Sequence, residues 1–213
     1  MHSCAIEKYK ETLSLTSRQK QILVGSLLGD AHLESRYKLG CATLRIEHSY
    51  KQKEYVDWLY SGFKKWVRTL PRKRTRWSWG KKQDKYLFMT YGHKILGEFR
   101  EIFYRNKKKI VPENIEYHLT PLSLAVWYMD DGSIKSRKHK GMFLNTQAFS
   151  LSDVKRLQGI LRKKFLIENI TRKDKSGLQI YILGRSAENF MRLIRPYIIP
   201  SMEYKIPKLL RLT

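Results

Sequence analysis

Two aspartates in this chain occupy the same unusual position, at the end of an apolar segment with the residues of a helix. Asp30 follows ILVGSLLG at residues 22–29, and Asp131 follows LSLAVWYMD at residues 122–130. A carboxylate at a helix C-terminus faces the negative end of the helix dipole, which costs about 0.3–1 kcal/mol. One such aspartate is explained by capping of the following turn. Two at matching positions indicate a function.

Paired carboxylates of this kind are suited to binding a divalent cation. The small residues Gly25, Ser26 and Gly29 allow the first apolar helix to approach another helix closely. If the two helices pack side by side, their ends bring Asp30 and Asp131 together, and a cation offsets the repulsion. Carboxylate oxygens suit Mg²⁺, which beside a phosphate can generate a hydroxide nucleophile and stabilise the leaving oxygen. Two similar halves would offer one such centre to each strand of a duplex.

The segments around the two aspartates repeat in the same order, which predicts two similar halves. Thr16 with Gln19, and Thr120 with Pro121, predict the starts of the two apolar helices. In each half an alternating strand, an amphipathic helix, a β-hairpin and a further helix follow. They are expected at residues 42–49, 54–67, 74–82 with 85–92, and 93–103 in the first half, and at 142–149, 152–165, 168–173 with 178–184, and 186–194 in the second.

Each half closes on a lysine shortly before a proline, Lys109 in the first and Lys205 in the second. The pattern predicts an α+β fold of two pseudo-symmetric αββαββα halves, residues 14–112 and 116–208. No Ser/Gly-rich linker separates them, so loosely tethered domains are not expected.

The charge of the chain points to a polyanionic partner. Its 213 residues include 43 Lys and Arg against 19 Asp and Glu, a formal net charge of +24. Such a field attracts nucleic acid, DNA or RNA. Cys4 and Cys41 form no CxxC or Cys/His cluster, which argues against structural zinc. The chain shows no secretory signal, and its longest apolar run, residues 124–129, is too short to span a bilayer. We therefore expect a soluble intracellular protein, in a bacterial cytoplasm or an organelle, with no membrane partner.

Two nonamers carry a resemblance to a known family. LVGSLLGDA at residues 23–31 and LAVWYMDDG at residues 124–132 resemble two copies of the motif that names the LAGLIDADG homing endonucleases. LNTQ at 144–147 and PYIIPSMEYKIP at 196–207 are similar to mitochondrial intron-encoded members of the single-chain, two-motif type. The resemblance covers residues 14–208.

The resemblance implies a saddle in which the two motif helices form the interface between the halves and antiparallel sheets lie on DNA. It implies a monomer that cuts both strands of a long asymmetric duplex site and leaves 3′ overhangs. Asp30 and Asp131 fall on the eighth motif position, the catalytic metal-binding acid of the family. Lys109 and Lys205 match its active-site lysines.

The two motif copies differ at two positions. The third is Gly25 in one copy and Val126 in the other. The seventh is Gly29 in one and Asp130 in the other. The residues predicted at the metal site are those at motif positions seven and eight, namely Gly29, Asp30, Asp130 and Asp131. Asp131 is the expected ligand in the second copy, and Mg²⁺ is the expected cofactor. The unlike helices predict unequal cutting rates on the two strands.

The strands also carry side chains suited to DNA. Arginine pairs with guanine, and asparagine or glutamine with adenine, while lysine and arginine runs position the phosphate backbone. The predicted DNA-binding residues are Arg45, Glu47, Arg74, Arg76, Ser78, Lys81, Asn145, Gln147, Arg172, Lys173, Gln179 and Tyr181.

Other functions stay open at this stage. An intron RNA maturase needs the scaffold and the charge without cleavage, and a DNA binder that has lost activity needs only the surface. A ribosomal protein explains the charge but not the paired acids. The presence of Asp30, Asp131, Lys109 and Lys205 together favours the nuclease, because binding alone has no need of all four.

Overall fold

The computed structural model describes residues 4–35, 40–78 and 80–211, the side chain of Ser78 excepted. The chain divides into two compact units. One is built from Met1–Lys20 and Asp30–Ile102, the other from Gln21–Gly29 and Phe103–Thr213. Residues 21–29 thus group with the second unit although they belong to the first sequence repeat. The halves proposed from the repeat, 14–112 and 116–208, stay a prediction.

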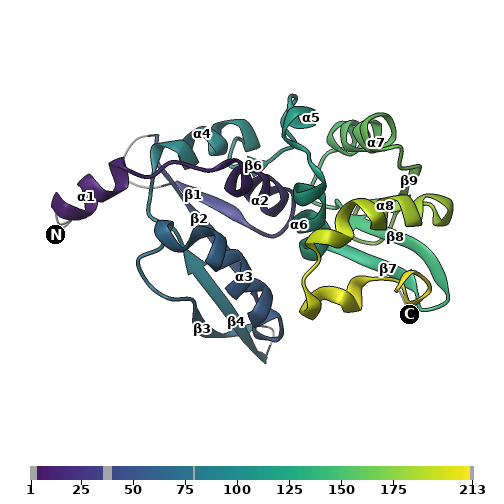
Figure 1. The fold of residues 1–213 in the computed structure, drawn as a ribbon, viewed down its shortest axis with the longest axis horizontal. Coiled ribbons are helices and arrows are strands. Elements are labelled where there is room, and N and C mark those ends of the chain that lie inside the picture. Colours follow the sequence, from purple (N-terminus) through teal and green to yellow (C-terminus); the bar gives the residue numbers. More distant parts are fainter. Residues whose placement is uncertain (1–3, 36–39, 79, 212–213) are drawn as a thin grey trace. The chain divides into compact units, whose positions relative to one another are not determined.

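The first unit is an antiparallel sheet with a helix packed on it (Figure 1). Its strand order is β1-β2-β4-β3. The alternation of apolar residues explains the packing, because Leu44 and Ile46 of β2 are fully buried and α3 packs on β2 and β4. The elements are α1 (Cys4–Glu11), β1 (His32–Ser35), β2 (Ala42–Ser49), α3 (Lys53–Phe63), β3 (Arg72–Ser78), β4 (Lys81–Met89) and α4 (Lys94–Phe103), while α2 (Ser17–Leu28) begins here and continues in the second unit.

The second unit contains the same arrangement. Its sheet has the order β7-β8-β10-β9, with α7 packed on β9 and β10 and α8 packed on α6 and β8. Leu144, Ile180 and Ile182 are fully buried. The elements are β5 (Tyr104–Arg105), β6 (Lys108–Lys109), α5 (Ile115–His118), α6 (Pro121–Asp131), β7 (Gly132–Ser136), β8 (His139–Asn145), α7 (Leu151–Phe165), β9 (Asn169–Lys173), β10 (Leu178–Ile182), α8 (Ala187–Ile194) and the 3-10 helices η4 (Arg195–Tyr197), η5 (Pro200–Lys205) and η6 (Lys208–Leu210).

Both sequence repeats therefore read αββαββα, as α2-β1-β2-α3-β3-β4-α4 and α6-β7-β8-α7-β9-β10-α8. The expected fold class of helices with antiparallel sheets in two halves is confirmed. Among the described residues, no helix has the length and apolar character needed to cross a bilayer.

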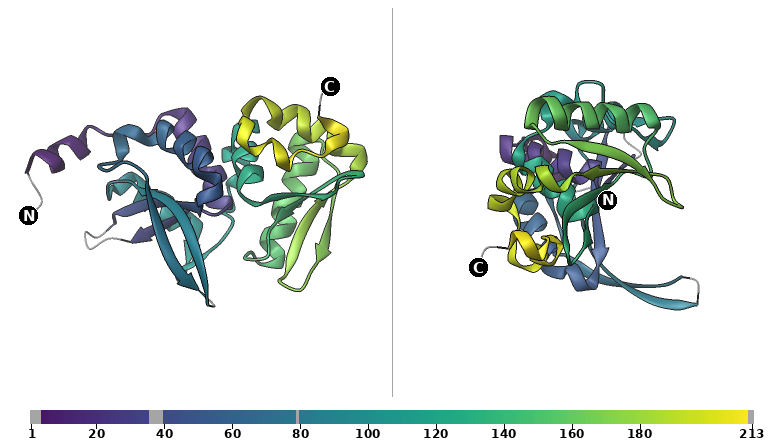
Figure 2. Two further views of the ribbon diagram at one scale, coloured as in Figure 1. Left: turned by 90° about the horizontal axis from the view of Figure 1, so that it is seen from below. Right: turned by 90° about the vertical axis from the view of Figure 1, so that its right-hand side faces the viewer.

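Two local predictions were wrong, and two strands were not predicted. The first hairpin does not turn at 83–84, because β4 already begins at Lys81, which pairs with Ser78 of β3. Gly80, just before β4, has φ +68° and supplies a left-handed turn conformation. The β3–β4 hairpin is long and extends past the other strands (Figure 2). In the second half the strand ends at Asn145, so Gln147 lies in a turn. The sequence patterns do not predict the short strands β1 and β7, which begin two residues after Asp30 and one residue after Asp131.

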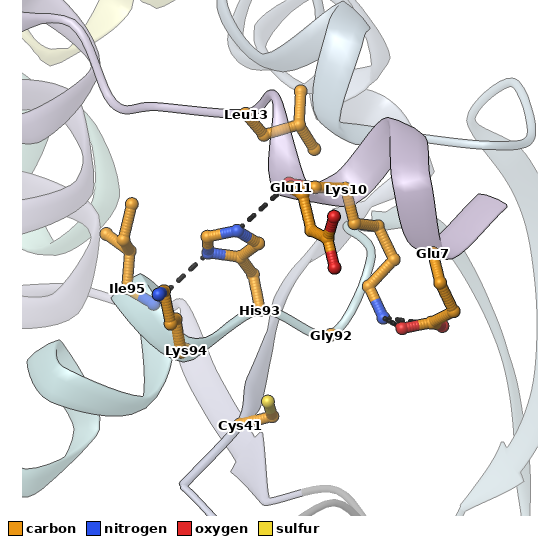
Figure 3. A pocket seen from close by; sticks show the side chains of 9 residues that line it. All are labelled: Glu7, Lys10, Glu11, Leu13, Cys41, Gly92, His93, Lys94 and Ile95. Atoms are coloured by element: carbon orange, nitrogen blue, oxygen red, sulfur yellow. Dashed lines mark hydrogen bonds and ion pairs between the residues drawn. The ribbon is translucent and has the colours of Figure 1, made fainter. Parts of the chain in front are cut away.

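A buried histidine fastens α1 to the first unit. The Nδ1 atom of His93 accepts a hydrogen bond from the Ile95 backbone N–H at 3.1 Å, and Nε2 lies 3.1 Å from the Lys10 carbonyl oxygen (Figure 3). Burial is the largest influence on this imidazole and lowers its pKa. The neutral ring therefore satisfies one donor and one acceptor, beside a cavity of about 530 Å³ that Cys41 also lines.

Candidate active site and DNA surface

Both motif helices begin at a capping box. The side chains of Thr16 and Gln19 exchange hydrogen bonds with each other's backbone N–H, at 3.2 and 2.9 Å. Thr120 and Ser123 do the same at the start of α6. The Thr120 hydroxyl also donates to Gln21 Oε1 at 2.8 Å, which ties the start of α6 to α2. The capping residues thus specify where each helix starts.

The two unlike motif positions meet in this helix pair. A Cβ built on Gly25 would lie 2.4 Å from the Ser123 carbonyl oxygen and 2.7 Å from Val126 Cβ. A Cβ built on Gly29 would lie 2.4 Å from both Cβ and Oδ2 of Asp130. Each glycine of α2 therefore leaves room for the larger residue at the same motif position of α6. The difference between the two motif copies at positions three and seven therefore allows α2 and α6 to pack closely.

A lysine closes the C-terminal end of each motif helix. Lys109 Nζ donates to the Gly29 carbonyl oxygen at 2.7 Å. Lys205 Nζ donates to the carbonyl oxygens of Met129 and Asp130, at 2.5 and 2.7 Å. A cation there stabilises the negative end of the helix dipole and satisfies carbonyls that have no partner within the helix. In both helices the lysine reaches the carbonyl at the seventh motif position, directly before the aspartate at the eighth.

Asp30 is half-exposed and lies in the first unit beside a buried histidine. Its side chain is 52% exposed, and its Oδ2 lies 3.5 Å from Nδ1 of His48, whose side chain is 3% exposed. Asp30 also lines a cavity of about 290 Å³ together with His32, Arg45, Glu47 and Arg76. The sequence patterns do not point to His48, because 18 residues separate it from the acid and no motif links the two residues.

Asp131 is the last residue of α6 and is half-buried, whereas Asp130 is buried against Gly29. Carboxylate oxygens fit a hard cation such as Mg²⁺. No group of three or more Asp, Glu, His or Cys suited to holding a metal occurs in the part of the chain that the structure describes. A cation at either acid would therefore complete its shell with water and substrate oxygens, the arrangement usual for Mg²⁺ at phosphate-transfer sites.

Comparison with known proteins agrees with this geometry. A model of the LAGLIDADG DNA endonuclease family matches residues 20–190. The chain belongs to this family.

Relatives of two kinds match most of the chain. "Probable intron-encoded endonuclease 1" of Wickerhamomyces canadensis is 32% identical over 96% of this chain and 91% of its own length. "Cytochrome b mRNA maturase bI2" of Debaryomyces hansenii is 34% identical over 90% of this chain and 74% of its own length. The chain is also similar to the solved structure of the homing endonuclease I-WcaI bound to its DNA recognition sequence, with 30% identity and a TM-score of 0.91. The match covers 100% of this chain and 94% of the I-WcaI chain.

The first sheet of this family member carries paired charges at the predicted DNA-reading positions. Arg45 contacts Glu47 closely and Glu34 at 3.1 Å, and Arg76 lies 3.9 Å from Glu47. The hydrogen bond to Glu47 is the largest influence on Arg45 and raises the pKa of its guanidinium. Burial alone would raise the pKa of Glu47, but the hydrogen bond and charge of Arg45 lower it. These side chains are held in place before any ligand arrives.

The second sheet carries cations stacked on an aromatic ring instead. Arg172 and Lys135 lie over the ring of Tyr181, at 4.6 and 5.7 Å from its centre. Tyr181 is 3% exposed and its ring contacts Phe143 at 4.9 Å. These contacts place two exposed positive charges on a rigid aromatic base.

The remaining predicted DNA contacts differ in their surroundings. Gln179 donates to Asn145 Oδ1 at 2.7 Å, and Gln147 donates to Asp174 Oδ2 at 3.0 Å. The side chain of Ser78 lies outside the described residues. The exposed basic positions are Arg74, Lys81 and Lys173. All of these assignments remain predictions.

Proposed function

We propose that this family member is a site-specific homing endonuclease that cuts one long, asymmetric duplex DNA site. It hydrolyses one phosphodiester bond on each strand, requires Mg²⁺ and leaves 3′ overhangs. The observation that carries the proposal is the matched end of the two motif helices. In each copy a lysine donates to the carbonyl at the seventh motif position, Gly29 or Asp130, and an aspartate follows at the eighth. The likeness to I-WcaI, a homing endonuclease solved on its DNA recognition sequence, supports double-stranded DNA as the substrate.

The two acids and the two lysines have separate roles in this proposal. Asp30 and Asp131 would hold Mg²⁺, with Gly29 and Asp130 next to them. When bound, Mg²⁺ lowers the pKa of water and stabilises charge on the leaving oxygen. Lys109 and Lys205 hold the helix ends and orient a nearby water or phosphate oxygen.

Binding of DNA follows from the charge and from the sheet faces. The formal charge of +24 attracts a duplex over many phosphates. Arg45 and Glu47 on β2, and Asn145 and Gln179 on the second sheet, are proposed to read base edges. With two motif copies in one chain, the active species is a monomer.

A second candidate is an intron RNA maturase. It is favoured by one observation, the 34% identity to a cytochrome b mRNA maturase. A maturase requires binding of structured RNA and has no need of cleavage, so the two functions separate in a single assay.

A cleavage selection tests the proposal. The protein is incubated with a randomised duplex library and Mg²⁺, beside the Asp30→Asn Asp131→Asn double variant, and the cut ends are sequenced. We expect one long asymmetric site cut with 3′ overhangs by the wild type alone. Absence of cutting, together with tight binding of a structured intron RNA, would replace the endonuclease by the maturase.

A further inference from the structure

The two proposed catalytic acids differ in their neighbours. The registers of the two sheets define which positions correspond. Leu33, three residues after Asp30, pairs with Leu44, and Ile134, three residues after Asp131, pairs with Met142. Counting along β2 and β8 from these pairs, His48 corresponds to Thr146. The first half therefore has an imidazole where the second half has a hydroxyl.

His48 is fixed by the packing of its own unit. Its imidazole lies against the ring of Tyr55 on α3, at a centroid distance of 5.2 Å, and Tyr55 is itself fully buried. Tyr55 stacks on Trp58 at 6.0 Å and an interplanar angle of 16°. The rings of Trp58, Tyr55 and His48 thus pack one against the next from α3 to β2. Nδ1 of His48 lies against the half-exposed carboxylate of Asp30.

Thr146 makes a different contact. Its hydroxyl donates to the Leu178 carbonyl oxygen at 2.8 Å, and the residue is buried. This hydroxyl is used by the sheet and closes the junction between β8 and β10. The second half therefore has a structural hydroxyl at the position where the first half has a ring aimed at the acid.

We propose that His48 is a positioning residue for Asp30, and that it sets the rate at which one strand of the duplex is cut. This inference rests on the proposed endonuclease function. An exposed aspartate rotates among several rotamers. The fixed imidazole of His48, with Nδ1 3.5 Å from Oδ2 of Asp30, favours the rotamer that keeps this contact. Partners of this kind around metal-binding carboxylates change metal affinity or activity by about 10–100-fold when removed.

The test compares two substitutions at His48 with one at Thr146. His48→Asn keeps a side-chain amide at the place of Nδ1, and His48→Leu keeps the volume without the donor. Thr146→Val removes the hydroxyl of the corresponding position. Each variant is assayed on a duplex carrying the selected site with a different label on each strand. The rates of cutting of both strands, the Mg²⁺ concentration for half-maximal rate and DNA affinity in Ca²⁺ are measured.

We expect His48→Leu to slow one strand about 10-fold or more relative to the other, with a higher Mg²⁺ requirement for that strand and DNA affinity unchanged. That strand should be the one slowed more by Asp30→Asn. His48→Asn should restore most of the rate, and Thr146→Val should leave the ratio of the two rates unchanged. Because misfolding slows both strands together, the ratio separates positioning from stability.

Equal slowing of both strands in His48→Leu, or no slowing, would overturn the role of His48. So would a Thr146→Val variant that shifts the ratio as much. A wild-type protein that cuts no duplex would instead remove the proposed function, and the two failures are therefore distinct.

Discussion

The two motif helices of this protein end in the same way but are not interchangeable. At both ends a lysine donates to the carbonyl at the seventh motif position, and an aspartate occupies the eighth. The α2 copy carries glycine where the α6 copy carries Val126 or Asp130, and each glycine leaves room for the larger residue. The acids then meet unlike neighbours, a buried histidine in the first half and a threonine used by the sheet in the second. The two copies share the positions of the aspartate and the lysine, while the contacts around the aspartates differ.

The largest expected effect concerns the acids themselves. Asp30→Asn or Asp131→Asn should abolish double-strand cutting while leaving DNA affinity unchanged, because a metal centre supplies several kcal/mol, a rate factor on the order of 10³. Asp130→Asn should have a smaller effect, because this carboxylate packs on Gly29. Strand-resolved cutting and equilibrium binding measure both. Full cutting by either of the first two variants would refute the assigned roles.

The glycine fit between the helices predicts a loss of stability. Gly25→Ala should lower the free energy of unfolding by about 1–3 kcal/mol, because its Cβ would lie 2.4 Å from the Ser123 carbonyl oxygen. Gly159→Ala in α7 is the matched control, since a Cβ there meets nothing within 4 Å. It should stabilise the protein by about 0.5–1 kcal/mol. Chemical denaturation gives both values, and equal effects would contradict the proposed fit.

The two sheets predict different responses to salt. Arg172 lies over Tyr181, whereas Arg45 is already paired with Glu34 and Glu47. Affinity for DNA should fall steeply with salt, and Arg172→Gln should lower the slope by about 0.9 for one lost phosphate contact. Arg45→Gln should leave the slope nearly unchanged and reduce sequence preference. The same loss of slope in both variants would remove the distinction between the sheets.

The smallest effect is a pH dependence confined to the first unit. The residue before α4 is His93, and the residue before α8 is Ser186, which does not titrate. Burial lowers the pKa of His93 below its ordinary 6.5, so the unfolded chain takes up the proton first. The stabilising contribution is complete above pH 6.5 and is lost as the pH falls toward the lowered value.

His93→Asn keeps an acceptor for the Ile95 N–H but does not titrate. Urea unfolding between pH 7 and 5 should therefore show a shallower loss of stability in this variant than in the wild type. Parallel curves would show that His93 plays no part in the acid response.

The sequence predicts the order of the elements because apolar periodicity and helix caps are local. Thr16, Thr120 and Pro121 mark the starts of both motif helices, and the alternation in β2 marks its buried face. The repeat also locates Asp30, Asp131, Lys109 and Lys205 from the sequence alone.

The contacts between distant segments are harder to predict from the sequence. The fit of Gly25 against Val126 depends on helix crossing, and the approach of His48 to Asp30 depends on strand register, neither of which is encoded in local spacing. Gly80 did carry a usable signal, since a glycine between two polar strands is typical of a hairpin turn. The alternation on either side of Gly80 instead predicts one continuous strand.

The most direct test of the two-acid account is a crystal structure of the protein on its selected DNA site with Mn²⁺. Anomalous difference maps would locate the metal ions. We predict one metal within ligand distance of a carboxylate oxygen of Asp30 and one within ligand distance of Asp131. Metal bound only at Asp130, at the Glu34 and Glu47 pair, or at neither aspartate would contradict the assignment of these two acids.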